Sequence, residues 1–399
     1  MHDQTDNRHL GKETELLALE WTGSAWQSES TFHQLSPYIG KTKSSMAASL
    51  VARFSKEGDI VCDPFSGCGT FAFEAWQAGR HVVANDLSPY ANLLTKAKLF
   101  PYHSLQDALL DFDKIADKVT SGNWTCDLRR VPSWVRSFFH SETLREILAW
   151  TAVLTEERRW FLLACLLGIL HHQRPGFLSF PSSHTVPYLR GKKFPRSRFP
   201  ELYEYRSVKD RLEAKVKRAF RRVPELDFKL TRQCFNKSAN DLLPSATVDT
   251  ILTSPPYMRQ LDYGRDNRLR LWFLGCDDWQ TLDNVVSPGE DEFLTLMTRS
   301  FRRWKTVLKP GGYCVLVIGD ACSRANRSNL PHNVSKIAIE QVGGYSLILE
   351  HTDIIPNDRR VRRGIVGSTS ETILVLRNAG SRLPDSEVSR KRHAAALPH

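Results

Sequence analysis

A five-residue stretch, Thr253-Ser254-Pro255-Pro256-Tyr257, carries the residue types best suited to chemistry in this chain. It follows a strand-like run at 248–252, so we expect it just past the carboxyl end of a strand, where open α/β sheets bind ligands. The two prolines fix the backbone and remove two donors, which leaves carbonyl oxygens as acceptors. The serine adds a hydroxyl and the tyrosine a flat ring. These groups could stack on a planar ring and bind an exocyclic amino group, although a Pro-Pro turn that only caps a buried strand also fits the pentapeptide.

A second candidate segment is glycine-rich: Asp63-Pro64-Phe65-Ser66-Gly67-Cys68-Gly69-Thr70 lies between a short apolar strand at 60–62 and an amphipathic helix. A second strand at 81–84 ends at Asn85-Asp86, and Ser88-Pro89 is a typical helix start. This order predicts a nucleotide-binding βαβ unit, in which the glycines admit the ligand and the acid binds ribose hydroxyls. The dinucleotide fingerprint of dehydrogenases is also satisfied. Asp63 favours S-adenosylmethionine over NAD, because a carboxylate suits a cationic sulfonium and amino group better than a pyrophosphate.

The bulk composition narrows the class of protein. The 399 residues could form two domains, or one domain with a large insertion. A net charge of +11 favours a polyanionic partner, although a soluble protein can simply be basic. The eight cysteines form no CxxC pair and no metal-ligand spacing, so we expect reduced thiols, an intracellular protein and no metal site. No apolar run is long enough to span a bilayer, and we expect no membrane partner.

The patterns divide the chain into five parts. We expect an N-terminal tail over 1–30, a cofactor-binding half over 31–100, a helical and basic insertion over 101–226, a catalytic half over 227–378 and a disordered basic tail over 379–399. Helix-like patterns cover 107–119, 141–154 and 158–171 of the insertion, and strand-like patterns resume at 228–234, 313–318, 345–351 and 371–376. The segment 309–312, Lys-Pro-Gly-Gly, reads as a sharp turn.

The most basic part of the insertion runs from 189 to 222, with 13 Lys or Arg against four Asp or Glu. Aromatic residues lie between the basic ones, a pattern typical of contact with a phosphate backbone and unstacked bases. A solvated helix face whose aromatic residues pack inward is the alternative.

Taken together, 63–70 and 253–257 resemble the two signature motifs of the amino-group DNA methyltransferases, DPFxGxGT and (D/N/S)PPY. The likeness extends over 31–99 and 226–376. The resemblance implies an α/β protein with a Rossmann-like class I methyltransferase sheet, helices on both faces and a mostly helical insertion for target recognition. It implies S-adenosyl-L-methionine as cofactor, no metal and double-stranded DNA as substrate. A cytoplasmic protein associated with a bacterial or archaeal nucleoid is expected, and a cognate restriction endonuclease is a further partner left open.

The resemblance also assigns roles by position. The catalytic residues would be Ser254, Pro255, Pro256 and Tyr257. The cofactor-binding residues would be Tyr38, Asp63, Pro64, Phe65, Gly67, Gly69, Thr70, Asp86, Leu87, Asp241 and Thr253. Among them, Asp86 would bind the ribose and Asp241 the adenine amino group. The residues expected to contact nucleic acid are Arg190, Lys192, Lys193, Arg196, Arg198, Arg259, Arg265, Arg268, Arg360 and Arg362.

Serine in the variable place of the second motif is typical of the N4-cytosine branch, whereas the N6-adenine branch usually has Asp or Asn. The implied reaction is base flipping followed by direct methyl transfer to the exocyclic nitrogen. Carbon-5 methylation needs a cysteine after a proline, and the chain has no Pro-Cys. Adenine N6, an RNA amino-methyltransferase of the tRNA guanine-N2 type, a dehydrogenase and a non-catalytic nucleic-acid-binding protein stay open as alternatives.

Overall fold

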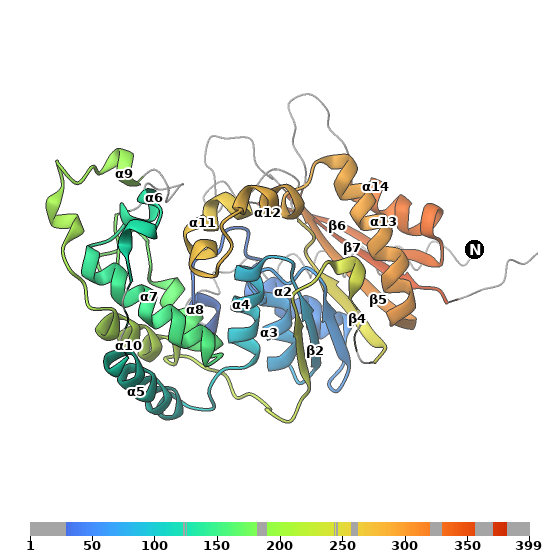
Figure 1. Ribbon diagram of the computed structural model, residues 1–399. Coiled ribbons are helices and arrows are strands. Elements are labelled where there is room, and N and C mark those ends of the chain that lie inside the picture. The colour runs from blue at the N-terminus through green and yellow to red at the C-terminus, as the bar shows by residue number, and fades with distance from the viewer. Residues whose placement is uncertain are drawn as a thin grey trace, which may run out of the picture.

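A seven-stranded mixed sheet lies at the centre of the computed structural model, which describes residues 29–122, 124, 126–181, 190–242, 244, 246–256, 262–319, 329–355 and 370–380 (Figure 1). The strands are β1 (Ile60–Asp63), β2 (His81–Asn85), β3 (Arg232–Phe235), β4 (Val248–Thr253), β5 (Leu308–Gly319), β6 (Tyr345–Ile354) and β7 (Ser370–Asn378). Their spatial order is β3-β2-β1-β4-β5-β7-β6. The first five strands are parallel and β7 is antiparallel to both neighbours. The predicted fold class, a Rossmann-like methyltransferase sheet, is confirmed.

Alternate residues of the central strands face two separate hydrophobic cores, as the two-residue period of a strand requires. Val61 and Val82 belong to one core, and Cys62 and Val83 to the other. Both faces of a mostly parallel sheet must be covered, and near-continuous apolar strands follow from that.

Helices cover each face of the sheet. On one face lie the 3-10 turn η2 (Thr31–Gln34) and the helices α2 (Ser44–Phe54), α3 (Thr70–Gln77) and α4 (Pro89–Leu99). On the other lie α13 (Glu290–Val307), α14 (Leu330–Lys336) and the π-helical turn η7 (Ile337–Val342) (Figure 1). The short turn η6 (Ala239–Asp241) and the helices α11 (Tyr263–Phe273) and α12 (Trp279–Val286) complete the catalytic half.

The insertion between β2 and β3 is helical and stands at the left of Figure 1. Its elements are α5 (Leu105–Ser121), η3 (Leu128–Arg130), α6 (Ser133–Arg136), α7 (Ser141–Glu156), α8 (Trp160–Gly168), α9 (Arg190–Lys193), η5 (Pro200–Tyr203) and α10 (Val208–Ala219). It has no core of its own, because its buried side chains join the core that covers α3 and α4. Phe32 marks the junction: its ring lies 5.9 Å from Phe73 of α3, and 5.4 Å from both Phe161 of α8 and Phe220.

Three expected elements differ from the sequence patterns. The strand expected at 228–234 begins only at Arg232, since the preceding segment turns to give its Asp227 carbonyl to the Trp76 indole N–H at 2.8 Å. The segment 309–312, expected as a sharp turn before a strand, is instead an irregular part of β5: Gly311 has a φ of 80°, and the pairing with β4 shifts its register between Val248 and Thr250. Helix α12 was not expected, because it follows directly on a helix and has no fully buried residue.

Two further expectations concern membranes and the tails. Among the described residues, no helix has the length and apolar character needed to cross a bilayer. Residues 1–28 and 381–399, which hold most of the two expected tails, lie outside the described part of the chain.

Candidate cofactor and catalytic site

The two sequence motifs meet across one cleft. They follow β1 and β4, which pair in parallel, so both loops leave the same edge of the sheet at the point where the strand order reverses. The Thr253 hydroxyl joins them: Oγ1 donates to Oδ1 of Asp63 at 2.6 Å and accepts the backbone N–H of Phe65 at 3.1 Å. Ser254 and Pro256 line the cleft together with the glycine loop.

Two glycines of that loop have left-handed backbones, with φ of 52° at Gly67 and 75° at Gly69. A Cβ at Gly69 would lie 2.8 Å from Oγ1 of Thr95, so this glycine allows the loop to pack closely on α4. Gly67 instead lines the cleft, and its N–H donates to Oδ2 of Asp86 at 2.8 Å. The sequence therefore folds the loop tightly, with one glycine for packing and one facing the ligand space.

Two carboxylates, a half-buried one on Asp86 and a buried one on Asp63, lie at this cleft without an ion-pair partner among the described residues. Asp86 lines it, and Asp63 lies directly behind the lining residues Pro64 and Phe65. Neither forms an ion pair with any Lys, Arg or His of the described residues. Oδ2 of Asp63 is buried and has no hydrogen-bond partner there. A buried carboxylate without a counter-charge is costly, so this donor set fits a cationic ligand.

The environment shifts the pKa of both acids upward. Burial is the main cause and raises the pKa of Asp63 to about 8, against the hydrogen bond from Thr253 and with the help of the neighbouring Asp86 carboxyl. Burial likewise raises the pKa of Asp86 to about 6, against the N–H groups of Ser88 and Gly67. Shifts of this size at a cleft are typical of functional sites.

The opposite wall comes from the segment 36–42. Tyr38, Gly40, Lys41 and Thr42 line the cleft, and Lys41 is the one cation among its described lining residues. The Tyr38 ring lies 6.1 Å from the rings of Tyr90 in α4 and Tyr263 in α11. These contacts hold the wall between the cofactor-binding half and the helix that follows the catalytic loop.

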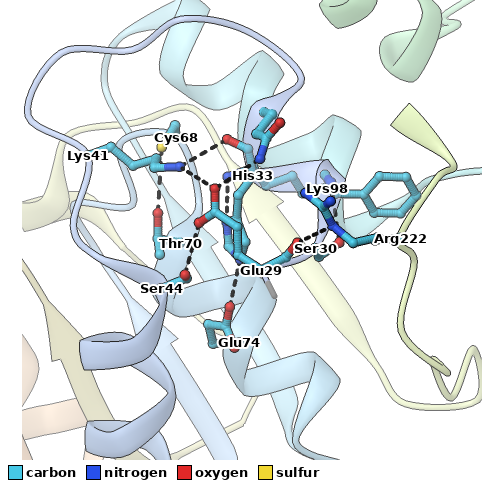
Figure 2. A network of polar contacts seen from close by, with 12 residues as sticks. Glu29, Ser30, His33, Lys41, Ser44, Cys68, Thr70, Glu74, Lys98 and Arg222 are labelled. Atoms are coloured by element: carbon cyan, nitrogen blue, oxygen red, sulfur yellow. Dashed lines mark hydrogen bonds and ion pairs between the residues drawn. The ribbon is translucent and has the colours of Figure 1, made fainter. Parts of the chain in front are cut away.

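A buried polar network fastens this wall to the core (Figure 2). His33 stands between two charged groups: Nε2 lies 2.6 Å from Oε1 of Glu74 and Nδ1 lies 3.3 Å from Nζ of Lys98. Lys98 can only donate, so Nδ1 accepts and Nε2 carries the proton given to Glu74. Burial, with Lys98 and Lys41 nearby, lowers the pKa of His33 well below its usual value, which keeps the ring neutral. Lys41 in turn donates to the His33 carbonyl at 3.2 Å and pairs with Glu29 at 3.7 Å.

Most of the predicted cofactor residues are brought together. Seven line the cleft: Tyr38, Pro64, Phe65, Gly67, Thr70, Asp86 and Leu87. Asp63, Gly69 and Thr253 lie buried around it and do not line it. Asp241 does not fit its predicted place: it is exposed at the end of η6, because one 3-10 turn carries it away from the cleft, which Ser238 and Ala239 line instead.

The sequence patterns missed several lining residues. They are Ser66, Cys68, Asn85, Ser88, Ser238, Ala239, Tyr263, Val285, Val286 and Leu296. Those inside the glycine loop and beside Asp86 could have been inferred from their motif neighbours. Val285 and Val286 gave no signal, since α12 itself was not expected.

In the catalytic loop, the Ser254 hydroxyl donates to the Val317 carbonyl at 3.0 Å. A serine hydroxyl that donates in this way keeps lone pairs with which it can accept hydrogen bonds. Pro255 follows it and Pro256 lines the cleft. Tyr257 lies outside the described residues.

The predicted nucleic-acid residues divide into three groups. Lys192, Lys193, Arg196 and Arg198 are exposed on and after α9. Arg265 pairs with Asp262, and the Arg268 guanidinium lies 4.7 Å from the Trp134 ring of α6. Arg259, Arg360 and Arg362 lie outside the described residues.

The prediction for Arg190 is wrong. Its side chain is fully buried, donates to the carbonyls of Phe180 at 3.0 Å and Leu202 at 3.1 Å, and stacks on Tyr203 with its guanidinium 4.1 Å from the ring. The surrounding segments curl around this side chain and use it to satisfy their carbonyl groups, so it cannot reach a phosphate.

Part of the predicted cofactor-binding half matches a known protein family. Residues 38–121 match the family described as D12 class N6 adenine-specific DNA methyltransferase. The match begins at the Tyr38 wall, includes the glycine loop and Asp86, and ends before the catalytic loop.

Two curated relatives are Type II methyltransferases. M.MjaII of Methanocaldococcus jannaschii is 33% identical over 81 residues, which is 20% of this chain and 15% of the relative. M.BsoBI of Geobacillus stearothermophilus is 22% identical over 295 residues, 68% of this chain and 58% of the relative. This chain thus spans less than two thirds of either relative. Among solved structures, the rRNA methyltransferase aviRa from Streptomyces viridochromogenes aligns over 91% of this chain and 95% of its own, with a TM-score of 0.35 and 12% identity.

Proposed function

We propose that this protein is a DNA methyltransferase that transfers a methyl group from S-adenosylmethionine to an exocyclic amino nitrogen of a base. The observation that carries the proposal is the single cleft that Gly67 and Asp86 share with Ser254 and Pro256. This shared cleft supports the proposal, because a cofactor held by the glycine loop would lie within reach of a base held by the Ser254 loop, as direct transfer requires.

The residues of the cleft fit the cofactor's chemical groups. Asp86 would hold the ribose hydroxyls, and Leu87 with Ala239 would flank the adenine. Lys41 would face the carboxylate of the methionine end, while the buried charge of Asp63 favours the cationic groups. The cofactor, when bound, supplies a methyl group on positively charged sulfur.

The catalytic loop would prepare the target nitrogen. An exocyclic amino group is a poor nucleophile because its lone pair is delocalised into the ring. The Ser254 oxygen, whose proton goes to Val317, and the Pro255 carbonyl would each accept one N–H of the base. These two bonds pull the nitrogen toward tetrahedral geometry and localise the lone pair toward the methyl group. Tyr257 would stack on the flipped base and offset part of the cost of unstacking.

Two bases remain candidates. Cytosine N4 is favoured by the serine at position 254, the residue typical of that branch. Adenine N6 is favoured by the family match, although residues 38–121 do not include the catalytic loop. The name Type II methyltransferase of both curated relatives supports a role in restriction–modification, with the protein acting on DNA in the cytoplasm.

Exposed basic side chains would hold the DNA. Lys192, Lys193, Arg196 and Arg198 lie on and after α9, which stands at the upper end of the insertion in Figure 1. Phosphate contacts of this kind fix the position of the duplex without reading its sequence.

The test is methyl transfer from labelled S-adenosylmethionine to double-stranded DNA, with structured RNA offered in parallel. Digestion of the product to nucleosides identifies N4-methylcytosine or N6-methyladenine. We expect Ser254→Ala to lose nearly all transfer while cofactor binding is kept. Ser335→Ala is the matched control, because that buried hydroxyl also donates to a carbonyl, at 2.9 Å, but lies on α14. Transfer to RNA alone, or full turnover by Ser254→Ala, would contradict the proposal.

A further inference from the structure

The pair of carboxylates at the cleft calls for an explanation beyond cofactor contact. A single carboxylate would suffice to attract a cation, but here Asp86 lines the cleft, Asp63 is buried directly behind its lining, and neither has a described Lys, Arg or His in ion-pair contact. Two such charges close together oppose each other's ionisation unless a cation joins them.

The two acids are not equivalent. Asp86 accepts two backbone N–H groups, from Gly67 and Ser88, each at 2.8 Å. Asp63 accepts the Thr253 hydroxyl on Oδ1, and its Oδ2 has no partner among the described residues. Asp63 is therefore the acid whose charge is less well supported by the protein, and the one that holds a proton when the pocket lacks a cation.

The neighbours of Asp63 offer no cation to change this. The ionisable groups that act on Asp63, or on which it acts, are Asp86 directly after β2, Cys62 on β1 and Cys234 on β3, and all of them are neutral or negative. The adjacent strand β4 contributes only the Thr253 hydroxyl. The charge of Asp63 thus depends on what occupies the cleft.

The two forms of the expected cofactor differ by one charge, which is on the sulfur. S-adenosylmethionine carries a positive sulfur, and S-adenosylhomocysteine, left after transfer, carries a neutral thioether. Resting on the cofactor assigned under the proposed function, we propose that Asp63 discriminates between substrate and product: it releases a proton when the sulfonium form binds and takes one up when methyl transfer leaves the thioether. Charge balances at each step, since the methyl group leaves with the sulfur's positive charge and the target nitrogen then loses its own proton to solvent.

This proton exchange removes an unfavourable buried charge from the product complex. With the thioether bound, an ionised Asp63 would be a buried charge without a counter-ion, and protonation relieves it. Burial raises the pKa of Asp63 to about 8, so a proton is available for this purpose near neutral pH. Asp63 then acts as a specificity-determining residue for the charge of the sulfur.

The experiment is calorimetric titration of the full chain, without DNA, in two buffers of different ionisation enthalpy. The ligands are S-adenosylmethionine, S-adenosylhomocysteine and sinefungin, whose amine is a cation in place of the sulfonium. At neutral pH we expect the two cationic ligands to release about one proton more than the thioether. The ligands' own amino groups are titrated free in solution and their contribution subtracted.

A pH series of the wild-type protein gives a second measurement that needs no variant. The affinity ratio of S-adenosylmethionine to S-adenosylhomocysteine should rise about tenfold from about pH 7 to about pH 9, as Asp63 ionises. In Asp63→Asn this rise and the difference in proton release should both vanish. Asp249→Asn is the control, because that aspartate lies at the opposite end of β4 and pairs with Lys309.

Equal proton release for all three ligands, or a flat ratio in the wild-type series, would overturn the inference and leave the methyltransferase assignment intact. The same holds if Asp63→Asn keeps the full difference. Failure of all three ligands to bind would overturn both, because the cofactor itself would then be wrong.

Discussion

Removing the Thr253 hydroxyl is the smallest change that tests the link between the glycine loop after β1 and the loop after β4. Thr253→Val keeps the shape and the strand propensity of the side chain and removes only the hydroxyl. Two hydrogen bonds disappear: the one given to Asp63 at 2.6 Å and the one accepted from the Phe65 N–H at 3.1 Å. Because Thr253 is fully buried, water cannot replace either bond.

The magnitude follows from the charge of the acceptor. A hydrogen bond to an ionised group contributes about 1.5–3 kcal/mol, and a bond between neutral groups about 0.5–1.5 kcal/mol. The substitution therefore costs the ionised form of Asp63 about 1–1.5 kcal/mol more than the protonated form, which corresponds to a rise of about one pKa unit. With the pKa of Asp63 already at about 8, the ionised fraction at neutral pH falls about tenfold, and the affinity for S-adenosylmethionine should fall with it.

The pH dependence of stability has a definite sign. Burial puts the pKa of Asp63 in the folded protein above its unfolded value of about 4. The folded state therefore binds the proton more tightly, and this contribution to stability is present in acid and is lost as the pH rises through about 8. Thr253→Val should move the end of that loss upward by about one pH unit.

Thr250→Val is the matched control. Thr250 lies on the same strand, is equally buried and donates its hydroxyl to the Phe54 carbonyl at 2.5 Å, far from the cleft. Both variants should lose about 1 kcal/mol of unfolding free energy in denaturant titrations. Only Thr253→Val should also weaken cofactor binding by calorimetry. Equal loss of affinity in both variants, or none in Thr253→Val, would refute the reasoning about the Asp63 bond.

Three further predictions concern other parts of the molecule. Arg190→Lys should destabilise the fold by about 2–3 kcal/mol, because lysine replaces neither the fork of carbonyl bonds nor the stack on Tyr203. The exposed Arg196→Lys should be neutral in the same denaturant titration. The double variant Lys192→Gln with Lys193→Gln should lower DNA affinity. It should also reduce the slope of log K against log salt by about one for each phosphate that is no longer neutralised, and leave cofactor affinity unchanged. A slope equal to that of the wild type would exclude this surface from the DNA interface. Lys41→Met should weaken S-adenosylmethionine binding about tenfold while Lys41→Arg retains most of it, since the role is that of a cation facing a carboxylate; equal affinity in both variants would remove Lys41 from the site.

The central sheet and the meeting of the motifs were predictable because they depend on local patterns. Asp63 and Asp86 each end an apolar strand, and parallel strands bring their carboxyl ends to one edge. The placement of the Ser254 loop beside them follows from the same rule. Nothing beyond the strand order was needed for these inferences.

Several side-chain positions could not be predicted from the sequence, because they depend on packing between distant segments. Arg190 looked like one of a run of surface cations, and only the fold shows that three segments close around it. Asp241 was placed by analogy with strand ends, but a single 3-10 turn moves it to the surface. Val285 and Val286 reach the cleft because α12 lies back against α11, where a Cβ at Gly264 would lie 2.5 Å from the Trp279 carbonyl. None of these placements has a local signature.

The attachment of the insertion to the rest of the protein also depends on packing between distant segments. Arg270 of α11 is buried, donates to the Leu167 carbonyl of α8 at 3.2 Å and to the His171 carbonyl at 3.4 Å, and lies 5.6 Å from the Tyr90 ring of α4. One guanidinium thus connects the insertion, the helix after the catalytic loop and the helix behind the Tyr38 wall. The basic residues near α9 are therefore carried on a support that shares its core with the cleft. If the insertion holds DNA as proposed, its contacts with the phosphate backbone would act on a frame continuous with Ser254 and Asp63, and the duplex would be held in register with the proposed site of transfer.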